Sequence, residues 1–451
     1  MNSPLNNTTF CLHTFGCQMN KHDSERVEGM LEALGSLPVE SVEEADIVVF
    51  LTCCVREAAD TRLYGQVSSL KNLPLRDGSP LRQRIVAVGG CIGQRDGEKL
   101  VQQMPHLNVV FGTHNLASLP GLLEAAVTQG GHQVEVLEAS EDFNDQLPSV
   151  REQAWAAWLP ITIGCNNFCT YCIVPYVRGR EKSRPLEDIR AEAQGLVAQG
   201  VKEITLLGQN VNSYGRDLYG QPRFVDVLDA VAETGIERIR FATSHPKDLT
   251  DEVIARFGTL PNLMPYLHLP AQSGSNRILK AMNRRYTREH YLDLVRKVRE
   301  ACPDIALSTD IIVGFPGETE EDFLDTLALV KEVGYHQAFT FIYSKREGTP
   351  AAKMEDDTPR EVIQDRFDRL VDAVQEGAFA ANQMFAGTVQ PVLVEGASKR
   401  DERLLVGKSP HNVTVHAPLP PEVSAQQLAG SVVNVRIGEA RTWYLSGKLA
   451  E

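Results

Sequence analysis

The sequence has no long hydrophobic run. Its longest near-apolar stretch extends from Ile47 to Val55, far short of the roughly 20 residues that span a bilayer. Its amino terminus, MNSPLNNTTF, has no basic start followed by an apolar segment. We therefore expect a cytoplasmic protein without a membrane partner.

Positive charge is also scarce. The chain has 45 Lys and Arg against 59 Asp and Glu, a net charge of −14. Binding to a polyanion depends on the local field and not on the total, so this sum neither proves nor excludes a nucleic-acid partner. A basic stretch stays a candidate for phosphate contact: Arg178, Arg180, Lys182 and Arg184.

Cysteine is the residue type that needs an explanation. The chain of 451 residues has 9 cysteines, an odd number, and cytoplasmic thiols stay reduced. A disulfide framework is therefore disfavoured, and metal binding or catalysis is favoured. The length predicts about three domains.

The first 130 residues repeat one pattern. Three strand-like runs, FCLHTFG, DIVVFLT and IVAVGG, lead to Cys17, Cys53 and Cys91, and helix-like stretches follow. For the first of these helices, Asp23 or Ser24 is a plausible N-cap. The succession predicts a parallel α/β sheet with all three cysteines at the carboxyl edge, where ligands of such sheets gather. A polar stretch from Glu138 to Gln146 reads as a linker.

From Trp155 onward, strand and helix patterns alternate over about 220 residues. Six strands are expected, LPITIG, EITLLG, RIRFA, MPYLHLP, ALSTDIIVG and AFTFIY, which is fewer than the eight of a full barrel and predicts a partial (β/α)6 barrel. The last part has five short strand-like pieces and predicts a small OB-like β-barrel. We expect an α/β chain with domains at residues 1–130, 150–383 and 384–451.

The strongest chemical signal is the spacing C-x3-C-x2-C formed by Cys165, Cys169 and Cys172 directly after the first barrel strand. Three thiolates on one loop can hold an iron–sulfur cluster with one iron left open. Structural zinc normally has four protein ligands, and no His or fourth Cys lies close in sequence. Zinc and unligated thiols are the weaker alternatives.

This loop at the mouth of a partial barrel resembles the radical S-adenosylmethionine superfamily. The resemblance implies that a 4Fe-4S cluster on Cys165, Cys169 and Cys172 binds S-adenosylmethionine and cleaves it to a 5′-deoxyadenosyl radical. It places Tyr171 beside the adenine and implies that the cofactor pocket includes Thr243, Ser244, Asp310, Gly314 and Glu318. Alternatively, Gly314 and Gly317 serve only a turn, and Thr319 with Asp322 forms a capping box.

The amino-terminal motifs TFGCQMN, TCCVRE and GGCIGQ resemble the methylthiotransferases. That resemblance implies a second, auxiliary 4Fe-4S cluster on Cys17, Cys53 and Cys91. The family usually has Asn where this chain has Leu51, and an additional Cys54 follows Cys53. The register favours Cys53 as the ligand, with Cys54 directed elsewhere, although the two could be exchanged. Cys11 and Cys302 are expected in hydrophobic cores.

The string QNVNSYG resembles the corresponding sequence in one branch of the methylthiotransferases. Enzymes of that branch methylthiolate C2 of N6-isopentenyladenosine next to the tRNA anticodon. In this string, Asn210 and Asn212 either bind a base edge or cap the loop. The alternatives are methylthiotransferases for threonylcarbamoyl-adenosine or for a ribosomal-protein aspartate and, remotely, a non-catalytic iron–sulfur RNA-binding protein.

The carboxyl-terminal piece resembles the TRAM domain, an RNA-binding barrel, in which four residues supply charge while aromatic residues are scarce: Lys399, Arg400, Arg403 and Lys408. The resemblance implies two partners, the tRNA anticodon stem-loop and an electron donor such as flavodoxin or ferredoxin, and a monomeric enzyme. Deleting this domain is expected to weaken tRNA binding and to leave cofactor cleavage intact.

Overall fold

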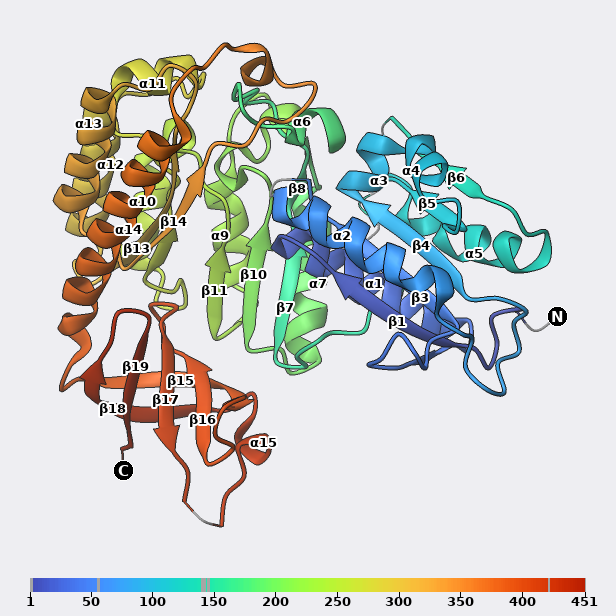
Figure 1. The fold of residues 1–451 in the computed structure, drawn as a ribbon. Coiled ribbons are helices and arrows are strands. Elements are labelled where there is room, and N and C mark those ends of the chain that lie inside the picture. Colours follow the sequence, from blue (N-terminus) through green and yellow to red (C-terminus); the bar gives the residue numbers. More distant parts are fainter. Residues whose placement is uncertain (1–2, 55–56, 139–142, 144–146, 421, 451) are drawn as a thin grey trace. The chain divides into compact units, whose positions relative to one another are not determined.

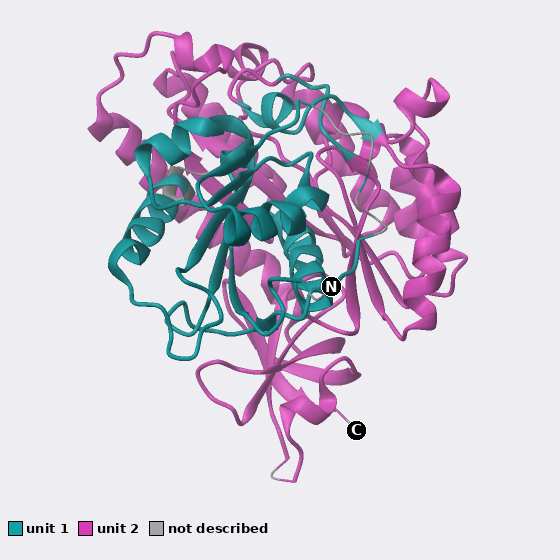
Figure 2. Cartoon of the chain, turned by 90° about the vertical axis from the view of Figure 1, so that its right-hand side faces the viewer, with its two compact units in different colours: residues 1–152, 163–168, 172–182 teal, residues 153–162, 169–171, 183–451 magenta. Residues whose placement is uncertain are grey.

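The structure is a computed structural model that describes the whole chain except residues 1–2, 55–56, 139–142, 144–146, 421 and 451. Most of the expected linker between Glu138 and Gln146 therefore lies outside the described residues. Contacts divide the chain into two compact units (Figure 2). Unit 1 comprises residues 1–152, 163–168 and 172–182, and unit 2 comprises residues 153–162, 169–171 and 183–451.

Unit 1 is built on a six-stranded parallel sheet in the order β2-β1-β3-β4-β5-β6. The two central strands, β3 and β4, are buried at every position, as expected for a parallel sheet covered on both faces. The predicted parallel sheet is confirmed. Its strands are β1 (Thr9–Thr14), β2 (Leu37–Pro38), β3 (Ile47–Thr52), β4 (Ile85–Gly90), β5 (Val109–Phe111) and β6 (Gln133–Glu135).

The helices of unit 1 pack on this sheet (Figure 1). They are α1 (Gln18–Ala33), α2 (Glu57–Ser69), η1 (Leu70–Asn72), α3 (Cys91–Asp96), α4 (Glu98–Gln103), η2 (Leu116–Ser118), α5 (Leu119–Thr128) and α6 (Val174–Val177). The expected N-cap at Asp23 or Ser24 is wrong. The N-cap of helix α1 is Cys17, six residues before Asp23, because the turn after β1 leads directly into the helix.

Unit 2 begins with two three-stranded parallel sheets, β7-β10-β11 and β12-β13-β14, whose order follows the chain. A parallel bridge between Ile239 and Leu263 connects them, and β7 and β14 are the two edge strands. The six strands therefore form the predicted open, partial barrel. They are β7 (Ala156–Pro160), β10 (Glu203–Leu207), β11 (Arg238–Phe241), β12 (Tyr266–His268), β13 (Ala306–Val313) and β14 (Gln337–Ile342).

The first barrel strand starts earlier than expected. It ends at Pro160, and the next residues form β8 (Thr162–Ile163), which pairs with β9 (Lys182–Ser183) in a separate two-stranded sheet. The helices of unit 2 cover the outer face of the barrel strands. The helical segments of unit 2 are α7 (Leu186–Ala198), η3 (Val211–Ser213), α8 (Arg216–Tyr219), α9 (Phe224–Ala232), η4 (Pro246–Asp248), α10 (Asp251–Thr259), α11 (Asn276–Ala281), α12 (Arg288–Ala301), α13 (Glu320–Val333), η5 (Pro350–Lys353), α14 (Arg360–Asn382), η6 (Gln383–Phe385) and α15 (Ala425–Leu428). Of these, α15 packs on the carboxyl-terminal strands.

Helix α13 shows how closely local sequence determines its start. The Thr319 side chain accepts a hydrogen bond from the Asp322 backbone, and the Asp322 side chain accepts one from the Thr319 backbone. The predicted capping box is thus present. Among the described residues, no helix is long and apolar enough to cross a membrane.

The carboxyl-terminal part of unit 2 is a closed five-stranded barrel in the order β15-β16-β17-β19-β18, as predicted. Its strands are β15 (Val389–Ala397), β16 (Leu404–Lys408), β17 (Thr414–Pro418), β18 (Val432–Ala440) and β19 (Tyr444–Leu449). A small apolar core fills its interior. We call this part the C-terminal barrel.

Candidate active site

The amino-terminal cysteines lie at the carboxyl ends of three neighbouring strands in unit 1. Cys17 is the N-cap of α1 after β1, Cys53 directly follows β3, and Cys91 is the first residue of α3 after β4. Since β1, β3 and β4 are adjacent, the sheet brings together side chains that are separated by 36 and 38 residues in the sequence. The expected placement at one edge is therefore observed.

Glycines permit the close approach of the strand-end loops. Gly16 has a φ of 111°, and a Cβ atom there would lie 2.1 Å from the Cβ of Cys53. Gly90 has a φ of 83°, and its Cβ would lie 2.7 Å from the Thr52 carbonyl oxygen. Only glycine tolerates both this backbone conformation and this proximity.

The thiols interact in two pairs. A hydrogen bond with Cys53 lowers the pKa of Cys17 to about 6. A hydrogen bond between Cys54 and Cys91 lowers the pKa of Cys91 and raises that of Cys54. The expectation that Cys54 points away from the group is therefore wrong, because its thiol hydrogen-bonds the thiol of Cys91.

A buried guanidinium supplies positive charge to these thiols. Arg178 follows α6 and donates to the Asn20 side-chain oxygen at 3.0 Å, with Asp23 at 3.5 Å. Its charge also helps to lower the pKa of Cys17 and Cys91. Arg178 is thus not available as the expected phosphate contact.

Arg184 is likewise unavailable, because it is buried and forms an ion pair with Glu192 at 2.7 Å. Burial removes a guanidinium from water and requires such partners. Of the four basic residues in this stretch, Arg180 is exposed. It stacks over the Phe168 ring, with 4.4 Å between the guanidinium carbon and the ring centroid.

The donor set at this edge fits iron. Thiolates are the ligands of iron–sulfur clusters, and Cys17 and Cys91 favour that form. Within the described part of the chain, no three His, Cys, Asp or Glu side chains are already grouped around a metal position. The thiols would have to turn toward a common centre to hold a cluster.

The loop of the second cysteine triplet is divided between the units, with Cys165 and Cys172 in unit 1 and Cys169 in unit 2. In unit 1, the Cys165 amide donates to the Gly179 carbonyl at 3.1 Å, and the Asn167 amide donates to the Cys165 sulfur at 3.5 Å. Gly164 has a φ of 73°, and a Cβ there would lie 2.1 Å from the Arg180 carbonyl oxygen. The loop is thus shaped by its own backbone contacts.

In unit 2, Arg284 contacts the middle of the same loop. Its Nη1 lies 3.5 Å from the Cys169 sulfur and 3.5 Å from the Tyr171 hydroxyl. Its Nη2 donates to the Pro270 carbonyl at 2.9 Å, and the guanidinium is buried. The sequence analysis missed Arg284, since an arginine more than 110 positions away from the cysteines carries no local signal of this contact.

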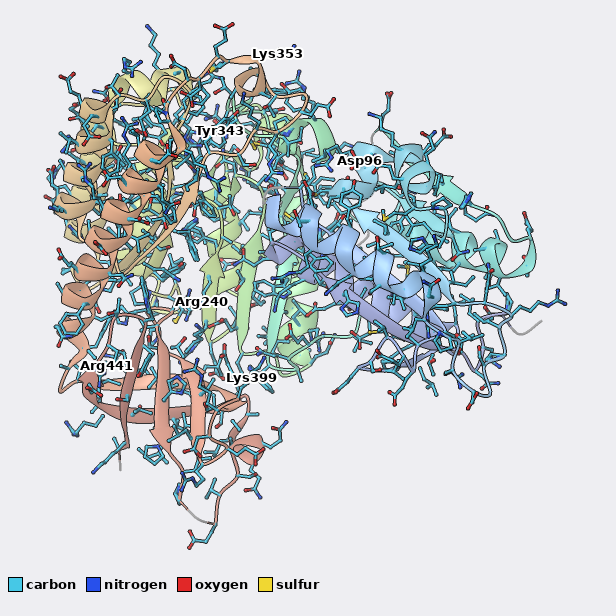
Figure 3. The ribbon with its side chains drawn as sticks, viewed as in Figure 1. Asp96, Arg240, Tyr343, Lys353, Lys399 and Arg441 are labelled. Carbon is cyan, nitrogen blue, oxygen red and sulfur yellow. The ribbon has the colours of Figure 1, made fainter. Side chains whose placement is uncertain are left out.

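Buried polar atoms without a partner gather after the barrel strands of unit 2. Five strands contribute such atoms in the segments that follow them: Thr162 Oγ1, Asn210 Oδ1, both side-chain polar atoms of Asn212, Ser244 Oγ, His245 Nε2, Glu318 Oε1 and Tyr343 Oη. Buried polar atoms are normally hydrogen-bonded, so this end of the barrel fits a polar ligand. Tyr343 marks this end in Figure 3.

One of these residues, Asn210, was expected either to bind a base edge or to cap its loop. Asn210 precedes η3, but its side chain does not cap that helix and instead donates to Asp248 at 2.7 Å. Thr243 adopts a φ of 69° directly before Ser244, an unusual conformation for a β-branched residue that often marks a functional site. His245 was not singled out from the sequence, and its burial lowers its pKa.

The segment after β13 holds a buried carboxyl. Burial raises the pKa of Glu318 to about 7. One of its oxygens accepts the Gly314 amide at 2.8 Å, and Arg366 lies 3.5 Å away. Gly314, with a φ of 68°, makes the turn that positions this amide. Asp310, on β13, lies 3.5 Å from His268.

The C-terminal barrel presents charge and aromatic rings. Lys399, Arg400 and Arg403 are exposed in the loop between β15 and β16. Lys408 differs from the expectation, because its Nζ donates to Thr414 at 2.8 Å and burial lowers its pKa. Although aromatic residues are few, Trp443 is 50% exposed, a feature that the sequence analysis overlooked in the string RTWYLSG.

Comparison with known families gives three matches. Residues 159–330 match the Radical SAM superfamily, residues 9–112 match Uncharacterized protein family UPF0004, and residues 383–450 match the TRAM domain.

Curated relatives match over almost the whole chain. A tRNA-2-methylthio-N(6)-dimethylallyladenosine synthase of Clostridium perfringens is 48% identical over 445 residues, covering 98% of both chains. The enzyme of that name from Acetivibrio thermocellus is 48% identical over 98% of this chain and 90% of its own. That from Acidothermus cellulolyticus is 52% identical over 90% of this chain and 82% of its own.

Among solved structures, the radical S-adenosylmethionine methyltransferase TsrM from Kitasatospora setae, with cobalamin and a [4Fe-4S] cluster bound, has a TM-score of 0.54 at 13% identity. The match covers 76% of this chain and 74% of that chain. At this identity the likeness shows a shared fold.

Proposed function

We propose that this chain, which belongs to the family of the tRNA-2-methylthio-N(6)-dimethylallyladenosine synthases, adds a methylthio group to C2 of N6-isopentenyladenosine next to the anticodon of tRNA. The observation that carries this proposal is the presence of two separate thiol groups in one chain. One group lies at the edge of the unit 1 sheet, and the other lies on the loop after β7. Such an arrangement suits an enzyme that both generates a radical and supplies sulfur.

Membership in the Radical SAM superfamily implies a 4Fe-4S cluster and S-adenosylmethionine. We assign that cluster to Cys165, Cys169 and Cys172, and an auxiliary 4Fe-4S cluster to Cys17, Cys53 and Cys91. The corresponding domains are residues 1–130 for the auxiliary cluster, 150–383 for the radical barrel and 384–451 for RNA binding. The pocket for S-adenosylmethionine comprises Tyr171, Thr243, Ser244, Asp310, Gly314 and Glu318.

When bound, the two clusters and S-adenosylmethionine supply the 5′-deoxyadenosyl radical and the methylthio group. The chain's own residues bind and orient these groups. Arg284 holds the Cys169–Tyr171 segment through the Tyr171 hydroxyl. Ser244 and Glu318 each present a buried polar atom without a protein partner, which supports their role in holding a polar cofactor.

The family name and the TRAM match imply a tRNA substrate. Because an anticodon loop already exposes its bases, an extruded adenosine can enter the mouth of the barrel at low cost. Exposed Lys399, Arg400 and Arg403 support phosphate contacts by the C-terminal barrel. An electron donor such as flavodoxin or ferredoxin, a monomeric state and a cytoplasmic location complete the proposal.

The decisive experiment is nucleoside analysis. We expect the anaerobically reconstituted protein, given a reductant and S-adenosylmethionine, to convert an anticodon stem-loop that carries N6-isopentenyladenosine into its 2-methylthio form, detected by mass spectrometry. Stem-loops carrying threonylcarbamoyl-adenosine, and the ribosomal-protein aspartate substrate, serve as matched alternatives. Product from one of those alone would replace the proposed substrate, and a protein that cleaves no S-adenosylmethionine would support a non-catalytic role.

The ligand assignment is tested by iron content. Two 4Fe-4S clusters predict about eight iron atoms per chain, and replacing Cys165, Cys169 and Cys172 by Ala should halve the iron and abolish 5′-deoxyadenosine formation. Cys53→Ala should also lose half of the iron but keep cofactor cleavage. Cys54→Ala is the matched control and should keep both clusters. Iron lost in Cys54→Ala but kept in Cys53→Ala would exchange the two assignments.

A further inference from the structure

The C-terminal barrel exposes two aromatic rings at one turn. Trp443 lies in the turn between β18 and β19, and Tyr444 is the first residue of β19. Their exposed fractions are 50% and 41%. Rings that stay in contact with water contribute little to a folded core, and Trp and Tyr are enriched at binding surfaces. The turn is therefore a candidate contact for a partner.

The turn is held in place by the end of α14. Asn382 is buried, and its side-chain amide donates to the carbonyl oxygens of Arg441 and Thr442 at 3.0 and 2.9 Å. The Arg441 amide closes the turn by donating to the Tyr444 carbonyl at 2.9 Å. A turn that is fixed in this way presents Trp443 at a low entropic cost of binding.

The ring of Tyr444 points out of the barrel. Leu445 belongs to the apolar core of the barrel, so Tyr444, Ser446 and Lys448, which alternate with the inward side chains of β19, face outward. The Tyr444 ring lies 5.3 Å from the ring of His416 on the adjacent strand β17, at an interplanar angle of 87°. This edge-to-face contact orients the Tyr444 ring.

Two cations share this outer face. Lys448 is exposed, and its register partner across β18 and β19 is Arg436, which is also exposed. Like charges directly opposite each other destabilise a pair of strands. The cation nearer the turn, Arg441, is instead paired with Glu439 at 2.7 Å. An anion bound to Arg436 and Lys448 would relieve their repulsion, and both residue types bind phosphate.

This face is separate from the basic loop between β15 and β16, which contains Lys399. That loop follows Ala397, the last residue of β15, whereas Arg436 pairs with Val389, the first residue of the strand. A strand of nine residues extends about 26 Å. Accordingly, Arg441 and Lys399 lie on different sides of the barrel in Figure 3. The C-terminal barrel therefore has two distinct basic regions.

We propose that the outer face formed by Arg436, Trp443, Tyr444 and Lys448, which we call the stacking face, binds an unpaired stretch of RNA. A base stacks on Trp443, and Tyr444 and the two cations hold the nucleotides that follow. Tyr444 and Lys448 are four positions apart on β19, or about 13 Å, so these contacts require more than one nucleotide. The inference rests on the proposed function in one respect, that the substrate is RNA.

The combination of rings and cations favours unpaired RNA over other partners. Every base has a flat face that can stack on an aromatic ring, and a cation beside the ring can bind the phosphate backbone. In a duplex these faces are covered by the neighbouring base pairs. An apolar protein partner would have to bury Arg436 and Lys448 side by side, which is costly without acidic partners.

The test measures RNA affinity without catalysis. The full-length, anaerobically reconstituted protein is titrated, by fluorescence anisotropy, into three labelled RNAs: an unmodified anticodon stem-loop, an oligouridylate of the same length and a blunt-ended duplex with as many phosphates. Trp443→Ala should weaken binding of the first two about five- to 150-fold, the effect of one lost stacked base, and leave duplex affinity unchanged. Trp443→Phe keeps a ring and should retain most of the affinity.

Salt dependence separates stacking from charge. Trp443→Ala removes no phosphate contact, so the slope of log affinity against log salt should stay the same. Lys448→Ala should reduce this slope for the oligouridylate by about 0.7. Leu324→Ala is the matched control, because Leu324 is an apolar side chain on α13 that is 47% exposed, and it should leave the affinity and the slope unchanged.

Three results would overturn the proposal. They are unchanged stem-loop affinity in Trp443→Ala, an equal loss for the duplex, and a loss confined to the binding of flavodoxin, which would assign the face to an electron donor. A protein that binds none of the three RNAs would contradict this proposal and the RNA substrate together. RNA binding as expected with an unreactive stem-loop would count only against the proposed methylthiolation, because the titration involves no reaction.

Discussion

At the scale of single residues, burial decides which charged side chains are available to a ligand and which have a shifted pKa. Arg178 and Arg184 belong to one basic stretch that would suit phosphate contacts if it were exposed, yet both side chains are buried against protein partners. Burial raises the pKa of a carboxyl group, whereas it lowers the pKa of a cationic group. Glu25, on α1, is buried, and desolvation raises its pKa to about 7 even though it accepts the Glu152 amide at 3.2 Å.

Glu25 predicts a pH-dependent stability. Its pKa is higher in the folded protein than its ordinary value of 4.5, so the folded state binds the proton more tightly. The stability contributed by this proton is present below pH 4.5 and is lost as the pH rises through about 7. Glu25→Gln should therefore raise the free energy of unfolding at pH 8.5 by on the order of 1–3 kcal/mol and have little effect near about pH 4.5.

The measurement is urea unfolding of the metal-free full-length protein across this pH range. Glu32→Gln, an exposed change on the same helix, is the matched control and should show no such trend. A stability difference for Glu25→Gln that is independent of pH would contradict the raised pKa.

At the scale of elements, the junction between strand and helix shapes the site. Each of the three amino-terminal cysteines follows a strand, and two of them begin a helix. The close approach depends on Gly16, since a Cβ at that position would overlap the Cys53 side chain. The loops can converge only as long as these positions stay without side chains.

Gly16→Ala should therefore disrupt one thiol group. The new methyl group must displace Cys53, so we expect the loss of about half of the iron, with 5′-deoxyadenosine formation retained. Gly130→Ala is the matched control, because Gly130 has a φ of 72° and open space around its Cβ position. It should cost about 1 kcal/mol through backbone strain alone and keep all the iron. Full iron in Gly16→Ala would contradict the steric argument.

At the scale of the whole molecule, the C-terminal barrel is not an independent attachment to the radical barrel. The expectation that its deletion leaves cofactor cleavage intact stays a prediction, but the two barrels are in contact, because Arg238 and Arg240 donate to the backbone of the C-terminal barrel and His411 lies 3.1 Å from Asp304. Removing these acceptors takes from both guanidinium groups their carbonyl partners, although Arg240 keeps its ion pair with Glu203.

Deleting residues 384–451 should accordingly lower the thermal stability of the protein and weaken tRNA binding. The measurements are thermal unfolding and tRNA affinity across a salt series. The double variant Lys399→Ala, Arg400→Ala keeps the loop between β16 and β17 and should weaken only tRNA binding, with a reduced salt dependence. A truncated protein with unchanged stability would show that the two barrels are independent.

The sequence by itself determined the architecture, because periodic apolar patterns and local capping signals act over short distances. Helices α12 and α13, the parallel sheet, the open barrel and the closed C-terminal barrel all agree with the local pattern. The strand ends also placed Cys17, Cys53 and Cys91 on one edge. Their roles as ligands, like those of Cys165, Cys169 and Cys172, stay predictions.

Only the tertiary structure decided which side chains meet. Cys54 contacts Cys91, Arg284 contacts Cys169, and Arg240 donates to the Ser409 carbonyl, although each pair is separated by many residues. Such contacts depend on how packed elements bring distant segments together, and burial then sets the charge and the pKa of each group. Neither the contact nor the burial is encoded in the local pattern, so the buried arginines became visible only in the folded chain.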